Sequence, residues 1–146
     1  MDIPASVAGF IVSEGEIFIF SKDCPVGIPE HRHVCIKHHE KYILLSTCSS
    51  RTATSYRLAV LRNWDLDTFP EFLPDVKNQF TKPTYINCNT VIELTEEEFG
   101  RLIKERKIFR DKRGGVIDEE GMCLIADGIL KSTEVDERIR DLFKKQ

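Results

Sequence analysis

The chain is 146 residues long, with 41% hydrophobic and 31% charged residues and a formal net charge of −3 at pH 7. These values are typical of one globular domain and exclude a disordered, collagen-like or low-complexity chain. They give no overall attraction to nucleic acid, so a nucleic-acid partner would need a local basic surface. We therefore treat residues 1–146 as a single domain.

Nothing in the sequence predicts a membrane protein or a disulfide framework. The apolar runs are short, far below the roughly 20 residues that span a bilayer, and the first residues, MDIPAS, form no secretory leader. The five cysteines are widely spaced and odd in number, so we expect reduced, mostly structural thiols. The expectation is a cytoplasmic protein without membrane contact.

The N-terminal part of the chain has the pattern of β-structure. The runs VAGFIVS and IFIF on either side of a glycine predict a hairpin, and two prolines within residues 21–30 predict a loop. Residues 33–37 and 42–48 carry almost consecutive apolar residues, which indicates strands covered on both faces. The KHHEK segment between them predicts an exposed turn that holds His38 and His39.

The middle of the chain alternates loops and short strands. Residues 49–55, SSRTATS, predict a hydroxyl-rich loop, and residues 56–61 predict a short strand. Residues 63–82 carry aromatic side chains without a clear period, which indicates an irregular connection that either packs its aromatics under itself or contains a short helical turn. The run PTYINCNTVIEL predicts a further strand with a break at 87–89.

Helices are predicted from Thr95 onward. Thr95 and Glu98 have the spacing of a capping box ahead of an apolar helical face. Asp118 is placed to cap a second helix with apolar residues at helical spacing, and a third follows over STEVDERIRDLFKKQ. A β-rich part at 7–94 followed by about three helices within 95–146 predicts an α+β fold or a small barrel.

The histidines and the arginine before the first core strand are the main candidates for chemistry. In an extended strand His31 and His33 would face one side and Arg32 the other, whereas in a loop all three could reach one cleft. Histidine transfers protons near neutral pH, and the planar arginine fork clamps phosphate. This pairing suits phosphodiester chemistry. The alternative is that they are ordinary polar residues at the start of a strand.

The segment after the second core strand supplies hydroxyl and guanidinium groups. Ser49, Ser50, Arg51 and Arg57 could bind phosphate oxygens and stabilise charge that develops on them. Serine and threonine are also common in turns, because their side chains bond to the local backbone. The position of this segment after the histidine strand favours a binding role.

Metal and nucleotide cofactors are not predicted. Cys24, His31, His33 and Cys48 are zinc ligands by type, but their spacing matches no zinc motif and a lone His-x-His is unspecific. No glycine-rich phosphate loop or nucleotide fingerprint occurs. We therefore expect no cofactor and no metal, with a zinc site at Cys24, His31 and His33 as a weaker alternative.

The order of these features resembles the MazF/PemK-like toxin superfamily, specifically its distant, toxin-like members. The resemblance is carried by an early hairpin (VAGFIVSEGEIFIF), a loop with proline and glycine (CPVGIPEHR), a first core strand (HVCIK) and a second that ends in hydroxyls (YILLSTCSSR). The later PTYINCNTVIEL and the C-terminal helices are also similar to such proteins. The resemblance covers most of the chain through short motifs.

This resemblance implies an SH3-like β-barrel and a metal-independent endoribonuclease of a toxin–antitoxin pair. Such proteins cut single-stranded RNA, including mRNA, so the implied partners are RNA, an antitoxin protein and a second copy in a homodimer. Arg32 matches the family's arginine before the first core strand, and Ser49 matches its Thr/Ser at the end of the second. His33 stands where the family usually has proline.

Residues and resemblance together predict a cytoplasmic, toxin-like endoribonuclease. The predicted catalytic residues are Arg32, His31, His33 and Ser49. The predicted RNA-binding residues are Ser50, Arg51 and Arg57. In this hypothesis Arg32 stabilises charge on the phosphorane, and His31 or His33 moves protons. Ser49 together with Arg51 positions the phosphate. The alternative is a non-catalytic module on the same barrel that binds a protein or a nucleic acid.

Overall fold

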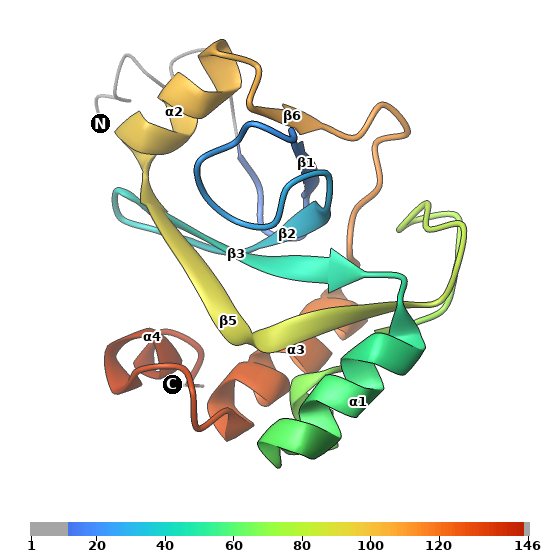
Figure 1. The fold of residues 1–146 in the computed structure, drawn as a ribbon. Helices are drawn as coiled ribbons and strands as arrows, with labels where there is room; N and C mark the ends of the chain where they lie inside the picture. Colours follow the sequence, from blue (N-terminus) through green and yellow to red (C-terminus); the bar gives the residue numbers. More distant parts are fainter. Residues whose placement is uncertain (1–11, 145–146) are drawn as a thin grey trace.

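A six-stranded antiparallel sheet forms the centre of the protein (Figure 1). The computed structural model describes residues 12–144. The strands are β1 (Ile17–Phe20), β2 (Arg32–His39), β3 (Tyr42–Ser49), β4 (Glu71–Phe72), β5 (Thr84–Thr95) and β6 (Ile108–Arg110). The helices are α1 (Thr52–Arg62), α2 (Glu96–Lys104), α3 (Glu119–Lys131) and α4 (Glu137–Asp141), with a 3-10 turn η1 (Leu66–Thr68). The predicted α+β class is confirmed.

The sheet is open. Its strands lie in the order β4-β5-β3-β2-β1-β6, and the two edge strands, β4 and β6, do not pair with each other within the described residues. The sheet therefore does not close into the small barrel that the resemblance implies. The expected division into a β-rich part and a helical part is followed only approximately. Helix α1 lies within the β-rich part, and strand β6 follows α2.

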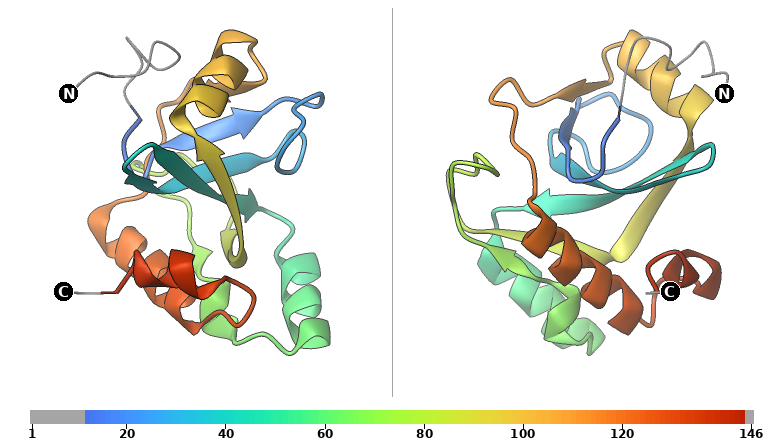
Figure 2. Two further views of the ribbon diagram at one scale, coloured as in Figure 1. Left: turned by 90° about the vertical axis from the view of Figure 1, so that its left-hand side faces the viewer. Right: turned by 180° about the vertical axis from the view of Figure 1, so that it is seen from behind.

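Helices cover both faces of the sheet. Figure 2 shows α2 on one side and α1, α3 and α4 on the other. On β3, Leu44 belongs to the same core as Ile125 of α3, whereas its neighbour Leu45 belongs to the core that contains Phe99 of α2. The prediction that the central strands are buried on both faces is therefore confirmed.

Side-chain caps begin the C-terminal helices where the sequence predicts them. The Thr95 hydroxyl accepts the Glu98 N–H at 3.0 Å and the Glu98 carboxylate accepts the Thr95 N–H at 3.0 Å, which completes the capping box of α2. Asp118 caps α3 by accepting the Gly121 N–H at 2.9 Å. Two of the three predicted helices are confirmed as α2 and α3, and the third, predicted over 132–146, is present only as the five-residue α4. No helix in residues 12–144 has the length and apolar character needed to cross a membrane.

The prediction for residues 49–61 is wrong, because α1 replaces most of the predicted loop and the short strand. Only Ser55 and Ala59 of this helix are buried, so its buried stripe is too narrow to give a clear helical period. Asn63, with φ 54° in the left-handed region, ends the helix. The short helical turn expected in residues 63–82 is confirmed as η1.

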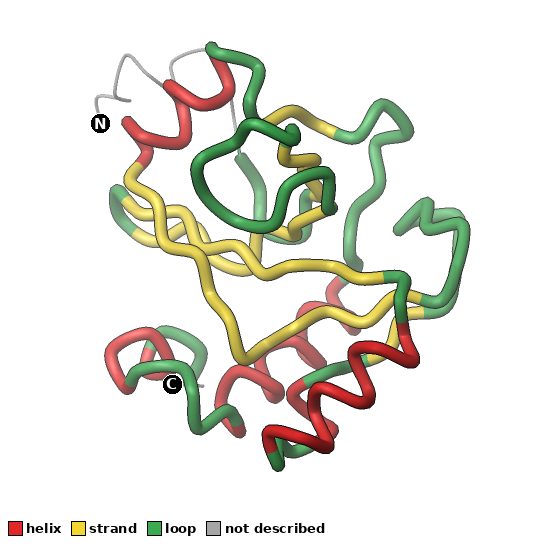
Figure 3. The backbone as a smooth tube through the Cα atoms, in the orientation of Figure 1, coloured by secondary structure: helices red, strands yellow, loops and turns green. Residues whose placement is uncertain are grey.

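The remaining strands agree in part with the sequence. IFIF forms β1, which pairs with β2 and β6, while most of its predicted partner, VAGFIVS, lies in residues 1–11, outside the described part. The predicted break at 87–89 does not end the strand, because β5 runs through these residues, but it falls where the partners on β5 jump from Ile86 to Val91. Its pairing with β3 shifts register between Ser46 and Cys48, and the strand bends along its length (Figure 3).

His38 is not part of an exposed turn. β2 continues to His39, and Glu40 and Lys41 form the turn. His38 Nε2 lies 2.9 Å from the carboxylate of the buried Glu96, which connects β2 to the start of α2. The prediction of an exposed position holds only for His39, whose ring is about half exposed.

Candidate functional site

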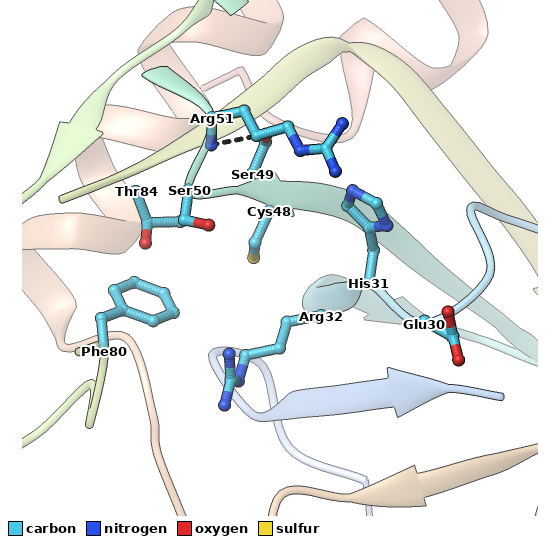
Figure 4. Close-up of a pocket in the computed structure, with 9 residues that line it drawn as sticks. All are labelled: Glu30, His31, Arg32, Cys48, Ser49, Ser50, Arg51, Phe80 and Thr84. Atoms are coloured by element: carbon cyan, nitrogen blue, oxygen red, sulfur yellow. Dashed lines mark hydrogen bonds between the residues drawn. The ribbon is translucent and has the colours of Figure 1, made fainter. Parts of the chain in front are cut away.

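A pocket of about 210 Å³ opens where β3 ends and α1 begins (Figure 4). Its walls come from the chain before β2, the start of β2, the end of β3, the segment before β5 and the first residue of β5. The lining residues are Glu30, His31, Arg32, Cys48, Ser49, Ser50, Arg51, Phe80 and Thr84. We name it the Arg32 pocket. It brings together most of the residues predicted for the site, but His33 and Arg57 do not line it.

A buried acid holds Arg32 in place. The Arg32 Nε–H donates to Asp111 Oδ2 at 2.9 Å, and the Asp111 side chain is only 6% exposed. Burial raises the pKa of Asp111, but hydrogen bonds from the Arg113 N–H and from Arg32 outweigh it, so the pKa lies below its usual value. The two terminal nitrogens of Arg32 make no hydrogen bond with residues 12–144, so they are available to an anionic ligand.

His31 has one ring nitrogen available. Nδ1 lies 3.0 Å from the carbonyl oxygen of Pro29, and because a carbonyl only accepts, Nδ1 carries the proton of the neutral ring. Nε2 is then an acceptor and has no partner in the described part of the chain. The ring is directed toward the Arg51 side chain (Figure 4). In this arrangement His31 can accept a proton from a ligand in the pocket.

His33 is buried beneath the loop that carries His31. Its ring has no exposed surface and stacks on Phe20, with 3.7 Å between the ring centroids. Nδ1–H donates to the His31 carbonyl oxygen at 3.0 Å, and Nε2 accepts the Ile28 N–H at 3.2 Å. Burial lowers the pKa of His33 to about 4. His33 is therefore neutral at pH 7, and both ring nitrogens hold the loop rather than face the Arg32 pocket.

The N-terminus of α1 adds positive potential to the pocket. Arg51 occupies the N-cap position, no side chain caps the helix, and its first turn has no acidic residue. The first N–H groups of a helix lack partners within the helix and attract anions. The Arg51 N–H donates to Ser49 Oγ at 3.2 Å, which places the Ser49 hydroxyl beside this helix end. The Arg51 guanidinium forms no ion pair with any described residue.

Arg57 belongs to a neighbouring surface. It lines a shallow hollow along α1 together with Tyr56, Val60 and Tyr85. An RNA strand would have to extend beyond the Arg32 pocket to reach it.

The acid that orients Arg32 had no signal in the sequence, whereas Cys48 was considered only as a zinc ligand by type. Asp111, which orients Arg32, is 79 positions away from it, and no motif links the two. Cys48 lines the pocket, but burial raises the pKa of its thiol to about 12 although nearby Arg32 acts in the opposite direction. All five cysteines are free, and the Cys48 thiol is protonated at neutral pH and is not a nucleophile.

The alternative zinc site is not formed. Residues 12–144 contain no group of three or more His, Cys, Asp or Glu side chains placed to hold a metal ion. Both ring nitrogens of His33 are occupied by backbone groups, which removes one of the three suggested ligands. In comparisons with known proteins, no family model and no curated protein matched the chain.

Proposed function

We propose that the Arg32 pocket binds a phosphate of single-stranded RNA and cleaves the adjoining bond without a metal ion. One observation carries the proposal: a histidine with an accepting Nε2 shares the pocket with two guanidinium groups and an uncapped helix N-terminus. Cleavage of a phosphodiester depends mainly on positioning and on stabilising negative charge. These groups supply both requirements, together with a base.

In the proposed reaction, His31 Nε2 takes the proton of a ribose 2′-OH. The 2′ oxygen then attacks the adjacent phosphorus, the bond from phosphorus to the 5′ oxygen breaks, and that oxygen takes a proton from water at the pocket mouth. The hydroxide left behind takes the proton back from His31, which restores the neutral ring. The products are a 2′,3′-cyclic phosphate and a 5′-hydroxyl. Arg32 stabilises the charge on the phosphorane oxygens, and Ser49 and Arg51 orient the phosphate. His33 acts through the loop as a positioning residue.

The resemblance to MazF/PemK-like toxins supplies the biological part of the proposal. It includes a cytoplasmic location, mRNA as the target, inhibition by an antitoxin protein and a homodimer. The relation of the open sheet to an SH3-like barrel is part of the same proposal. The positions of Arg32 at the start of β2 and Ser49 at the end of β3 support it, because they line one pocket.

Cleavage of a 5′-labelled single-stranded RNA in the presence of EDTA tests the proposal. We expect the wild-type protein to produce fragments that end in a 2′,3′-cyclic phosphate. Arg32→Ala and His31→Ala should each lower the rate by about 100-fold to 1000-fold, the usual effect of losing one catalytic donor or base. Lys104→Ala, on an exposed position of α2, is the matched control and should cleave like the wild type.

Folded Arg32→Ala and His31→Ala proteins that cleave RNA at the wild-type rate would contradict the assignment. Because Arg32→Ala removes the hydrogen bond to Asp111 Oδ2 and leaves this buried carboxylate only its contacts with Arg113, Arg32→Lys serves as a second variant. It keeps a charge beside Asp111 but loses the planar fork, so it should fold and still cleave more slowly than the wild type.

A non-catalytic RNA-binding module is the second candidate. It is favoured by the single histidine in the pocket, since metal-free cleavage uses both a base and an acid. It predicts that the wild-type protein binds the same RNA, that Arg32→Ala weakens binding, and that no cyclic phosphate forms.

A further inference from the structure

A second pocket lies next to the Arg32 pocket and shares part of its wall. Its volume is about 230 Å³, and His31, Ser49 and Arg51 line both pockets. Tyr85 also lines it, and we name it the Tyr85 pocket. A ligand that places a phosphate in the Arg32 pocket therefore has its neighbouring chemical group within reach of the Tyr85 pocket.

The walls of the Tyr85 pocket are apolar and aromatic. Tyr85 at the start of β5 and Leu58 of α1 both line it. Phe69 contributes to the wall, in an edge-to-face contact with Tyr85 at 6.4 Å between ring centroids. Trp64 stacks on Phe69 at 5.6 Å, so the aromatic wall is supported from behind. Such a wall suits a flat ring.

Two polar groups in the same pocket have unused hydrogen-bonding capacity. The Thr47 side chain lines the pocket, is 4% exposed as a residue, and makes no hydrogen bond within residues 12–144. Asn87 Oδ1 accepts the Asn89 N–H at 2.9 Å, which fixes the orientation of the amide. Its Nδ2 has only a long contact of 3.5 Å with Thr90. A hydroxyl without a protein partner and an oriented amide N–H are groups that read the edge of a base.

We propose that the Tyr85 pocket binds a nucleobase of the nucleotide whose phosphate occupies the Arg32 pocket. The base ring lies against Tyr85, as bases stack on aromatic side chains in single-stranded RNA complexes, and its edge faces Thr47 and Asn87. This nucleotide is the one that follows the cleaved bond and is joined to the bound phosphate through its 5′ oxygen, and its ribose lies beside Ser49 and His31, which line both pockets. This inference rests on the proposed phosphate binding and extends it to the base.

The test compares ligands that differ only in the base. Wild-type protein is titrated with the four nucleoside 5′-monophosphates and with ribose 5-phosphate, and binding is followed by NMR shifts of assigned residues. We expect at least one nucleotide to bind about 10-fold more tightly than ribose 5-phosphate, the size of one base-stacking contact. The nucleotide should shift the resonances of Thr47 and Tyr85, whereas ribose 5-phosphate should shift only those of the Arg32 pocket.

Substitutions in the wall of the Tyr85 pocket distinguish binding of the base from binding of the phosphate. Tyr85→Ala should weaken nucleotide binding about 10-fold and leave ribose 5-phosphate binding unchanged, and Tyr85→Phe, which keeps the ring, should behave like the wild type. Thr47→Val keeps the shape of the side chain and should lower the affinity for nucleotides but not for ribose 5-phosphate. It replaces Tyr85→Ala in the test if that variant does not fold.

Equal wild-type affinities for nucleotides and ribose 5-phosphate would overturn the base pocket while leaving phosphate binding intact. If neither ligand binds the wild-type protein, the proposed function itself is wrong, and the base pocket fails with it.

Discussion

At the scale of single residues, burial separates two histidines that the sequence presents as equivalent. His31 is half-buried and lines the Arg32 pocket, whereas His33 is fully buried against Phe20. The packing around His33 is tight. Gly27 has φ 72°, and a Cβ at this position would lie 2.6 Å from the Phe20 ring and 2.8 Å from His33 Nε2. One histidine lines the pocket and the other fixes the loop that carries it.

The buried His33 should make the protein sensitive to mild acid. Its pKa falls from 6.5 to about 4 on folding. Between these two pH values His33 is protonated in the unfolded chain and neutral in the folded chain. The stability that His33 contributes is complete above pH 6.5 and is lost as pH falls to about 4, by an amount of up to about 3 kcal/mol. Urea unfolding at pH 7 and pH 4.5 measures this loss.

His33→Phe keeps a ring on Phe20 but cannot titrate. We expect this variant to be less stable at pH 7, because the Ile28 N–H and the His31 carbonyl lose their partner, yet to lose less stability between pH 7 and pH 4.5. His39→Gln removes a half-exposed histidine of the same strand and is the matched control. A pH dependence in His33→Phe as steep as that of the wild type would refute this role.

At the scale of elements, α1 combines a weak helix start with a place at the proposed phosphate site. Its N-cap has no side-chain hydrogen bond, although such a bond typically contributes about 1 kcal/mol. Arg51→Asp would supply a cap and a negative charge at the helix N-terminus, so we expect it to raise the free energy of unfolding by about 1 kcal/mol. The same change should weaken RNA binding about 10-fold or more, because it replaces a cation with an anion beside the phosphate.

Arg51→Lys separates the two effects. It leaves the N-cap without a hydrogen-bonding oxygen and keeps the positive charge, so both stability and RNA affinity should stay near the wild-type values. Chemical unfolding and fluorescence anisotropy with a labelled RNA measure the two quantities. If Arg51→Asp gains stability and binds RNA as well as the wild type, the Arg51 side of the pocket does not contact phosphate.

The sequence predicted those elements whose signals are local. The capping box of Thr95 and Glu98 and the apolar runs of β2 and β3 identified α2 and the central strands. It also placed Arg32 and Ser49 at adjacent strand ends. It missed α1, because only Ser55 and Ala59 of that helix are buried and the hydroxyl-rich start is also typical of a loop.

Other features of the site depend on contacts between distant parts of the chain. The ion pair between Arg32 and Asp111 forms because β6 lies next to β1, which pairs with β2. The burial of His33 depends on Phe20 from β1. Neither contact leaves a pattern in one sequence, so the order of strands in the sheet had to be known before these roles could be assigned.

At the scale of the whole molecule, the net charge of −3 at pH 7 opposes RNA binding, so the proposed affinity for RNA would have to come from local cations. Two guanidinium groups, Arg32 and Arg51, line the Arg32 pocket. Each cation that neutralises a phosphate releases counterions, which gives a slope of log affinity against log salt of about −0.7 per contact for single strands. We therefore predict a slope of about −1.4 for wild-type protein.

This slope distinguishes a local site from binding over a broad surface. It is measured with a 2′-O-methyl oligonucleotide, which binds as RNA does but has no 2′-OH to attack the phosphate. Arg51→Gln should lower the affinity and reduce the slope to about −0.7, because one phosphate contact is lost. Lys104→Gln, on an exposed position of α2 away from the pocket, should leave both values unchanged. If instead the slope is much steeper and Lys104→Gln reduces it as much as Arg51→Gln does, many surface cations share the contact with RNA, and the Arg32 pocket is not where binding is concentrated.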